Sequence, residues 1–391
     1  MTSRVRHCAA RLLLGFAALA VAGCASKAGA PERAPTAAAT RAVTPNAGSP
    51  TATGTATPTS TSTPDTGAIA ATATPVSGTA GGTSVTISAV GDISLGRQVN
   101  DWMEQYGAGY PYELVRPLIT GEIGFANLEG ALTDRGEPWP KAFNFRTPPK
   151  FAPGLAEAGF DVVSLANNHA MDYGTIGMMD TVSALDVAGV RHAGAGSYAA
   201  DAWNSAIVES SGLRVSFIAC VLTPTEGSGF TIDQWAAGQG DAPGLSVCDT
   251  DKLEAWILSG REFADFVVVS IHAGDEYVNA PNGTQRALVE AALAAGADVV
   301  LGHHAHVVQP VEQRGGQLIA WGLGNFIFDL DQWDLAGIPE PRVSLILNIT
   351  LTKGAGVTAW EAVPVVLDAE QDRPRPATAE EAAVLEALIT P

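Results

Sequence analysis

Three histidines close together are the residues of this chain with the clearest capacity for chemistry. They stand in Gly302-His303-His304-Ala305-His306, directly after an apolar, strand-like run at 297–301. Neutral imidazole binds divalent metals, and side chains two positions apart on an extended segment point to the same side. We therefore expect His304 and His306 to share a metal site and His303 to face the other way. A solvated histidine loop is the alternative for such a motif without context.

Apolar runs that end in polar residues occur six times after residue 84. The runs are 85–88 before Asp92, 123–126 before Glu129, 162–165 before Asn167, Asn168 and His169, 266–271 before His272, 299–301 before the three histidines, and 318–321 before Asn325. Such β-branched runs are typical of strands buried on both faces, and helix-like stretches such as 285–295 alternate with them. The pattern predicts an α/β fold in which the strand ends share one edge.

Functional residues of α/β proteins usually gather outside the carboxyl ends of the strands. The candidates for one cleft are Asp92, Glu129, Asn168, His169, His272, His304 and His306. Carboxylates, an amide oxygen and imidazoles form a ligand set that suits Mn²⁺, Zn²⁺ or Fe²⁺, and one carboxylate can bridge two cations. Each residue also has an ordinary explanation, such as a helix cap, an Asx turn or a core histidine. Their occurrence at equivalent positions favours a metal site.

The first part of the chain is typical of an exported protein. Three arginines precede an apolar run at 12–21 that is too short to span a bilayer and is followed by small residues. Val21-Ala22-Gly23-Cys24 is similar to a bacterial lipobox, in which the cysteine is lipidated and becomes the first residue. We expect residues 1–23 to be a lipoprotein signal peptide and Cys24 to hold the protein on the outer face of the cell membrane. A secreted protein with a coincidental cysteine is the alternative.

Residues 24–83 consist mainly of threonine, alanine, proline, serine and glycine, so they cannot bury enough apolar surface to fold. We expect a disordered tether, followed by a folded domain at 84–391.

Of the net charge of −19, the signal region contributes +3 and the tether +1, which leaves −23 on the domain. This charge argues against nucleic-acid binding, and against a broad surface for an anionic polymer unless bound cations make the cleft positive. Cys220 and Cys248 could pair outside the cell or stay buried thiols.

Two further elements are expected after the last run. Residues 342–353 and 357–368 alternate apolar and polar side chains around Gly354-Ala355-Gly356, which predicts an antiparallel hairpin. Residues 378–388 carry two early glutamates in an apolar pattern, which predicts a terminal helix.

The polar motifs resemble the metallophosphatase-like superfamily, and more closely its branch of bacterial capsule-synthesis proteins, the CapA or poly-gamma-glutamate biosynthesis family (PGA_cap). The resemblance covers roughly residues 84–330. The motifs that carry it are Ala89-Val90-Gly91-Asp92, Phe125-Ala126-Asn127-Leu128-Glu129-Gly130, Leu165-Ala166-Asn167-Asn168-His169 with Asp172-Tyr173-Gly174, His272-Ala273-Gly274-Asp275-Glu276-Tyr277, Gly302-His303-His304-Ala305-His306 and Gly322-Leu323-Gly324-Asn325-Phe326. The family architecture that it implies is a four-layer αββα sandwich.

The resemblance also implies a role for each candidate. It gives the first metal to Asp92 and His306, the second to Asn168, His272 and His304, the bridge to Glu129, and contact with a substrate oxygen or protonation of a leaving group to His169. Metallophosphatases begin with Asp-x-His and usually bridge with an aspartate, whereas Ile93 and Ser94 follow Asp92 here. The first site therefore lacks one imidazole. Either a single cation binds, or Glu276 or His303 compensates.

Other polar residues are expected around the ligands. Asn167, Glu276 and Asn325 are candidates for orienting the histidines, with structural roles in turns as the alternative. Arg97 and Arg146 are candidates for meeting an anionic substrate, with a solvated or ion-paired role as the alternative.

Three functions are consistent with these residues. The first is a membrane-tethered, extracytoplasmic accessory in capsule or poly-gamma-glutamate biosynthesis, with the surface polymer or its synthesis and export machinery as partner. The second is a hydrolase of a phosphoester or related bond that depends on divalent metal, with two cations expected. The third, a catalytically inactive polymer-binding module, is disfavoured by the retained ligand set. Whether the protein is an enzyme stays open.

Overall fold

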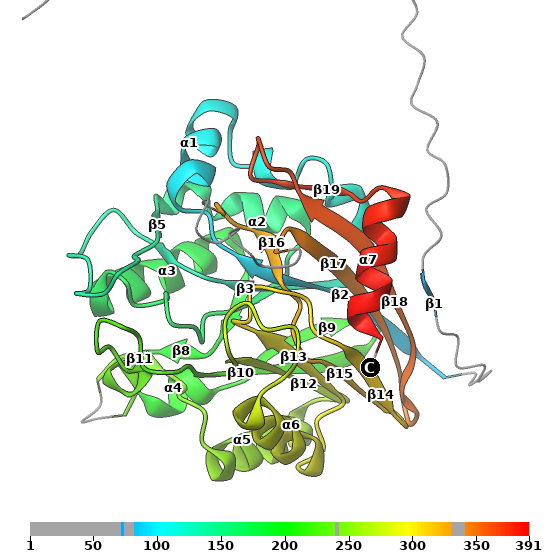
Figure 1. Cartoon of the computed structure of the whole chain (residues 1–391). Coiled ribbons are helices and arrows are strands. Elements are labelled where there is room, and N and C mark those ends of the chain that lie inside the picture. Colours follow the sequence, from blue (N-terminus) through cyan, green and yellow to red (C-terminus); the bar gives the residue numbers. More distant parts are fainter. Residues whose placement is uncertain (1–71, 74–81, 239–241, 331–340, 391) are drawn as a thin grey trace, which may run out of the picture. The chain divides into compact units, whose positions relative to one another are not determined.

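Two β-sheets form the centre of the protein (Figure 1). The computed structural model describes residues 72–73, 82–238, 242–330 and 341–390. In these ranges the larger sheet has nine strands and the smaller has six. Two additional pairs of short strands are β4 (Ala131–Leu132) with β5 (Arg146–Thr147), and β8 (Ala195–Gly196) with β11 (Gly244–Leu245).

The larger sheet is mixed. In order along it lie β1 (Thr72–Ala73), β18 (Gly356–Leu367), β17 (Val343–Thr352), β2 (Ser84–Ile93), β3 (Ile123–Leu128), β6 (Val162–Ser164) and β7 (Arg191–Ala193), while β16 (Asn325–Ile327) pairs with β2 and β19 (Pro374–Pro376) with β18. The neighbours β2, β3, β6 and β7 are parallel, and β16 is parallel to β2. Their carboxyl ends therefore meet at one edge of this sheet.

The smaller sheet has a parallel centre and antiparallel edges. Its order is β14 (Val311–Arg314), β15 (Gln317–Ala320), β13 (Val299–His303), β12 (Phe266–Ala273), β10 (Leu213–Leu222) and β9 (Ala206–Ser210). The four inner strands are parallel, and β9 and β14 pair antiparallel with their neighbours.

Successive residues of the smaller sheet point into two different apolar cores. Phe217 of β10 packs into the core shared with the larger sheet, where its ring stacks on Phe125 of β3 at a centroid distance of 5.6 Å. Ile218 packs into a second core together with residues of helices α5 (Thr250–Phe263) and α6 (Gly283–Ala294). Because both faces are buried, the strand sequences are continuous apolar runs.

The remaining α-helices of the described residues pack around these sheets. They are α1 (Arg97–Tyr106), α2 (Pro153–Ala158), α3 (Gly174–Ala188), α4 (Ala199–Trp203) and α7 (Ala379–Ile389). The last of them contacts β17 and β18. Its N-terminus is closed by a capping box in which Thr378 and Glu381 bond to each other's backbone, which stabilises a first turn whose N–H groups lack helical partners.

Most of the expected elements are confirmed. All six apolar runs form strands, the helix expected at 285–295 is α6, the hairpin is β17 with β18, and the terminal helix is α7. The expectation that the six strand ends share one edge is wrong, because β2, β3 and β6 belong to the larger sheet and β12, β13 and β15 to the smaller. A run buried on both faces does not reveal which strands are its neighbours.

The expected N-terminal signal peptide, Cys24 and most of the tether lie outside the described residues. Within the expected tether, Thr72 and Ala73 pair antiparallel with Ala362 and Glu361 of β18. Among the described helices, none is both long and apolar enough to cross a lipid bilayer.

The two cysteines of the folded part form a disulfide. Cys220 lies on β10 and Cys248 just before α5, with their Cα atoms 5.0 Å apart. Of the two alternatives that the sequence left open, a disulfide and two buried thiols, the structure has the disulfide.

Candidate metal centre

Two rows of strand ends meet at the candidate site. In the larger sheet, Asn325, Asp92 and Asn127 lie side by side on β16, β2 and β3. In the smaller sheet, His272 of β12 lies beside His303 of β13. The polar residues that follow the apolar runs are therefore brought together between two sheets rather than along one.

A glycine permits the first row to form. A Cβ atom on Gly91 would lie 2.0 Å from the carbonyl oxygen of Gly324, so no other residue fits at this position. The segment before β16 can therefore approach β2 closely. The backbone N–H of Asp92 then donates a hydrogen bond of 2.9 Å to Gly324 O.

Asp92 is fully buried and well provided with donors. Its Oδ1 atom lies 2.9 Å from both His303 Nδ1 and Asn127 Nδ2, and its Oδ2 atom accepts a hydrogen bond of 3.2 Å from the backbone of His304. Burial acts to raise the pKa of Asp92, but His303, His306 and Asn127 outweigh it and hold this pKa below its ordinary value. The side chain is thus kept as an anion beside the histidines.

Glu129, in contrast to Asp92, has no hydrogen-bond donors among the described residues. Its carboxylate is completely buried, and neither oxygen has a hydrogen-bond partner among the described residues. The Nε2 atoms of His169, His272 and His306 each lie 3.9 Å from its Oε1 atom. Burial raises the pKa of Glu129 well above its ordinary value. Removing a carboxylate from water without donors or a cation costs roughly several kcal/mol. The position of Glu129 therefore calls for a partner such as a cation.

The distances around Glu129 fit a divalent cation. A separation of 3.9 Å is too long for a hydrogen bond. Nitrogen and oxygen ligands lie about 2.0–2.2 Å from Zn²⁺, so an imidazole nitrogen and a carboxylate oxygen on one ion are at most about 4.3 Å apart. The distances of His272 and His306 therefore allow each to share a cation with the Glu129 oxygen.

His272 and Asn168 place two potential metal-ligand atoms next to each other. The Nε2 atom of His272 lies 2.9 Å from Asn168 Oδ1, and its Nδ1 atom lies 3.2 Å from Asn127 Nδ2. Burial, reinforced by the neighbouring histidines, lowers the pKa of His272 well below its ordinary value. The ring is therefore neutral, which is the form that binds a metal.

His304 and His306 reach the site from a turn. Strand β13 ends at His303, and both later histidines have left-handed backbones, with φ of 85° and 54°. The expectation of an extended segment is therefore wrong at these positions, although both side chains do lie at the site. Left-handed backbones are costly for residues other than glycine and often occur at functional sites.

The pKa values of the two histidines in this turn shift in opposite directions. Burial, reinforced by His306, lowers the pKa of His304 to about 3. Burial also opposes charge on His306, but the carboxylates of Glu129, Asp92 and Glu276 raise its pKa to about 9. The Nδ1 atom of His306 lies 2.9 Å from Asn325 Oδ1, and Asn325 Nδ2 donates to the backbone oxygen of His306. Asn325 thus orients the ring and leaves Nε2 toward Glu129.

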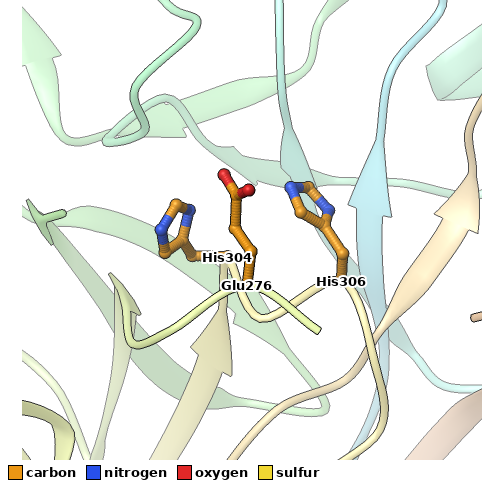
Figure 2. A group of neighbouring side chains, drawn as sticks. All are labelled: Glu276, His304 and His306. Carbon is orange, nitrogen blue, oxygen red and sulfur yellow. The ribbon is translucent and has the colours of Figure 1, made fainter. Parts of the chain in front are cut away.

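Glu276 joins these two histidines. Figure 2 shows its carboxylate between the rings of His304 and His306, and one ligand atom from each of the three lies within 4.8 Å of the others. A second group at the same spacing consists of Asp92, Glu129 and His272. Glu276 is exposed, whereas the other members of both groups are buried.

His303 contacts the site instead of facing away from it. Its Nδ1 atom is bonded to Asp92, and its Nε2 atom is buried without a hydrogen-bond partner in the described ranges. The alternation of side chains along a strand fails as a guide here because the chain turns directly after His303. We assign His303 to orienting Asp92.

His169 is held by an aspartate from its own loop. Its Nδ1 atom lies 2.7 Å from Asp172 Oδ2, and its ring lies against Phe145 at a centroid distance of 4.2 Å. A proton on Nδ1 donates to the carboxylate, which leaves Nε2 on the side of Glu129. Burial lowers the pKa of His169, while Asp172 opposes this effect.

Lys141 is a site residue that the sequence analysis missed. Its side chain is completely buried, with Nζ 2.8 Å from Asp172 Oδ1 and 3.6 Å from Glu226, and it also donates to the backbone oxygen of Asn168. No local pattern marks it, because a single lysine in a loop is ordinarily solvated. Asp172 was visible in the motif three residues after His169, and that spacing was the available signal.

The remaining candidates lie around the cluster or away from it. Asn167 donates to Asn127 and to the backbone oxygen of Leu128, so it supports the loop. Arg97 forms an ion pair of 3.3 Å with Asp329 and lines a small cavity together with His169, Glu276 and His306. Arg146 lies over the ring of Tyr173 at 4.4 Å and is not part of the cluster.

A cleft opens onto these groups. Its cavity has a volume of about 380 Å³ and is lined by Asn168, His169, His304 and, at the rim, by Glu226 and Glu276. This volume is in the range of small-molecule sites. Imidazole, amide and carboxylate groups thus face a space that a substrate group can enter.

Comparisons with known proteins agree on one family. The model of the family described as bacterial capsule synthesis protein PGA_cap matches residues 86–330. The PGA biosynthesis protein CapA of Bacillus subtilis (strain 168) is 33% identical over 307 residues, covering 78% of this chain and 76% of that protein. The capsule biosynthesis protein CapA of Bacillus anthracis is 32% identical over 306 residues, covering 75% and 70%. A protein of Mycobacterium tuberculosis named "Probable polyglutamine synthesis accessory protein" is 30% identical over 285 residues, covering 68% and 72%.

Proposed function

The chain belongs to the family of bacterial capsule synthesis proteins, PGA_cap, and from this premise we propose that it is an accessory protein in the biosynthesis of a capsule or poly-gamma-glutamate type surface polymer. The names of the relatives support this process. We further propose that it works with a dinuclear metal centre of the metallophosphoesterase type, on a four-layer αββα fold. The two packed sheets with α5 and α6 on an outer face support that fold.

We also propose that the protein acts outside the cytoplasm, held to the membrane by a lipid on Cys24. The arginine-flanked apolar run and the lipobox-like residues 21–24 support this location. The long proline-containing segment that follows would let the domain reach the polymer or its synthesis and export machinery.

The single observation that carries the metal proposal is the carboxylate of Glu129. It is buried, has no hydrogen-bond donor among the described residues, and has three imidazole Nε2 atoms at 3.9 Å. Without cations this group is a buried carboxyl group whose ionisation burial disfavours, whereas with cations it would serve as a shared ligand.

We divide the ligands between two cations as in the family pattern, with Asp92 and His306 on one of them. The His306 ring faces Glu129 through Nε2, because its Nδ1 atom is bonded to Asn325. Asn168 and His272, which are in contact with each other, are assigned to the other cation together with His304. We assign Glu276, rather than His303, to the position of the missing imidazole, since Glu276 lies at ligand spacing from His306 and His303 belongs to neither ligand group.

The cations would activate water and stabilise the negative charge that develops when a phosphoester or related bond is attacked. His169 would act beside them as an acid. Its Nδ1–H is fixed on Asp172, so Nε2 is free to contact a substrate oxygen, and His169 would become an acid only after Nε2 has taken up the proton that the attacking water releases. Lys141 holds Asp172 and the backbone of Asn168 in place, and it contributes a positive charge behind His169.

The proposal is tested on the full chain by metal analysis and by hydrolysis of bis(p-nitrophenyl) phosphate. We expect about two equivalents of Mn²⁺, Zn²⁺ or Fe²⁺ per chain, and loss of both metal and hydrolysis in His304→Ala. His192→Ala is the matched control, because His192 lies on β7 outside the cluster. Protein that binds no divalent metal after loading would refute the metal centre.

The same measurements separate the alternative functions. Hydrolysis of the generic phosphodiester supports a hydrolase, whose substrate can then be unrelated to capsule. Stoichiometric metal without turnover supports an accessory role in which the centre binds polymer or a lipid-linked precursor without cleaving it. A metal-free, inert protein leaves a polymer-binding module.

A further inference from the structure

A second cavity lies at the far end of α1 from the metal centre. It has a volume of about 960 Å³, and none of its lining residues lines the metal cleft. Its walls come from the last turns of α1, from the short helix η1 (Tyr110–Tyr112), and from the segment between β18 and β19. The lining includes one tryptophan and three tyrosines, Trp102, Tyr106, Tyr110 and Tyr112.

Three of these rings form a platform. The centroid distances are 5.9 Å from Trp102 to Tyr106, 5.0 Å from Tyr106 to Tyr110, and 6.0 Å from Trp102 to Tyr110, with interplanar angles of 21° to 30°. In a column of three stacked rings, the longest distance would be close to the sum of the other two. The near-equal distances mean that the three rings form a triangular cluster rather than a column, with neighbouring rings partly stacked on each other.

This ring surface is open to solvent. Tyr106 is 56% exposed, and Trp102 and Tyr110 are half-buried. A cluster of aromatic rings at the surface leaves apolar area in water that a ligand can cover.

Charged side chains border the platform, and their positive and negative charges nearly balance. The guanidinium of Arg373 lies 4.3 Å from the centroid of Tyr110, where Glu113 at 2.7 Å and Gln371 at 2.9 Å hold it. Arg116 and two further glutamates, Glu157 and Glu370, also line the cavity. Three carboxylates against two guanidinium groups disfavour a polyanion, while the side chains offer both donors and acceptors of hydrogen bonds.

A buried hydroxyl group in the wall lacks a partner among the described residues. Tyr112 is 1% exposed, and its hydroxyl has no hydrogen-bond partner among the residues that the structure describes. Buried hydroxyl groups are normally satisfied, so an unpaired one in a cavity wall is an observation that a polar ligand or water would explain.

We propose that this cavity binds a neutral carbohydrate chain. The C–H face of a pyranose ring is apolar and flat enough to stack on Trp102, Tyr106 and Tyr110. Its hydroxyl groups match a rim of carboxylate, amide and guanidinium groups. The site would hold the protein on a glycan while the metal centre acts elsewhere, and the inference stands independently of the metal proposal.

The proposal is tested by isothermal titration calorimetry of the full chain with two probes, the β-1,4-linked tetramers of N-acetylglucosamine and of glucose. We expect saturable binding of at least one tetramer, weakened about tenfold or more in Tyr106→Ala, because a stacked ring is lost. Tyr106→Phe keeps the ring and should keep most of the affinity. Tyr198→Ala is the matched control, since Tyr198 is also about half exposed, at 50%, and lies outside the cavity.

Three outcomes would overturn the proposal. The first is that neither tetramer binds at millimolar concentration, and the second is that Tyr106→Ala binds as well as the unchanged protein. The third is that the cavity selects a different class of ligand. In that case, soluble polyglutamate or a proline-containing peptide of residues 52–64 would bind and lose affinity in Tyr106→Ala, while the tetramers would not bind.

Discussion

The Nε2 atom of His306 lies 3.9 Å from the Oε1 atom of Glu129, and the imidazoles of His169 and His272 lie at the same distance from that oxygen. No hydrogen-bond donor reaches the carboxylate among the described residues. At this distance the imidazoles do not bond to the carboxylate directly, but they can bind a cation together with it. Bound metal should therefore stabilise the protein.

Replacement of Glu129 by glutamine should abolish the effect of metal on stability. The unchanged protein should be stabilised by divalent metal, by about 2.7 kcal/mol at one hundred times the Kd. Glu129→Gln should lose this gain, because the carboxylate that the cations would share has been removed. Thermal unfolding with and without EDTA measures the gain in both proteins. An unaltered response to metal in the variant would rule out the bridging role.

Glu276 should contribute to metal affinity although it is exposed. Glu276→Gln is expected to weaken the first metal about tenfold or more, because a charged ligand is replaced by a neutral one. Asp275→Asn is the matched control, since Asp275 is an exposed neighbour in the same cleft and belongs to neither ligand group. Competition with a metal-sensitive dye measures the affinity. Equal affinities in the two variants would exclude Glu276 as a ligand.

The buried pair of Lys141 and Asp172 should be strongly coupled. A double-mutant cycle with Lys141→Met and Asp172→Asn should give an interaction energy of about 1–3 kcal/mol, because either single change leaves a buried charge unpaired. The surface pair of Lys150 and Glu104, with N–O distance 2.7 Å, should give at most about 1 kcal/mol in the same experiment. Urea unfolding supplies the four free energies of each cycle.

Lys141 should also matter for turnover if the protein hydrolyses phosphoesters. Lys141→Met is expected to shift the pH profile of kcat, since the positive charge behind His169 is removed. A merely structural role would lower the amount of folded protein and leave the shape of that profile unchanged.

Metal-free protein should lose stability as the pH rises. The folded pKa of His306 is about 9, above its ordinary value of 6.5, so its contribution is complete below pH 6.5 and is lost as the pH approaches 9. The loss should be on the order of 3 kcal/mol. Urea unfolding in EDTA at several pH values measures it. His306→Gln should flatten the dependence and His192→Gln should not; the same slope in all three proteins would contradict the assignment.

The disulfide should contribute substantially to stability. Cys220 and Cys248 are separated by 28 residues, and closing a loop of this length stabilises a protein by about 3–4 kcal/mol in the chain-entropy model. The double variant Cys220→Ala/Cys248→Ala should be less stable than the oxidised protein by about this amount. Chemical denaturation under oxidising and reducing conditions compares them, and an oxidised protein no more stable than the reduced one would contradict the expectation.

The sequence by itself determined the local elements and the chemistry of the site. Continuous apolar runs such as 266–271 require two buried faces, and the capping pattern at Thr378 specifies a helix start. Both are short-range effects. The residues that end the strands could be named as candidate ligands for the same reason, since the position of Asp92 or His272 after an apolar run is visible without the fold.

Only the tertiary structure decided which of these residues meet. The strand ends divide between two sheets, so the site forms where Asp92 and Asn127 of one face His272 and His303 of the other. Strand pairing depends on contacts between residues far apart in the chain, which local patterns do not encode.

Backbone conformation and burial decided the rest. The turn with left-handed residues at His304 and His306 brings His303 to Asp92, against the alternation expected of a strand. Lys141 becomes a site residue only because the fold buries it against Asp172, and a lone lysine carries no such signal in the sequence. Local sequence specifies which groups are available, whereas long-range packing sets their distances and their exposure to water, and these decide what the groups can bind.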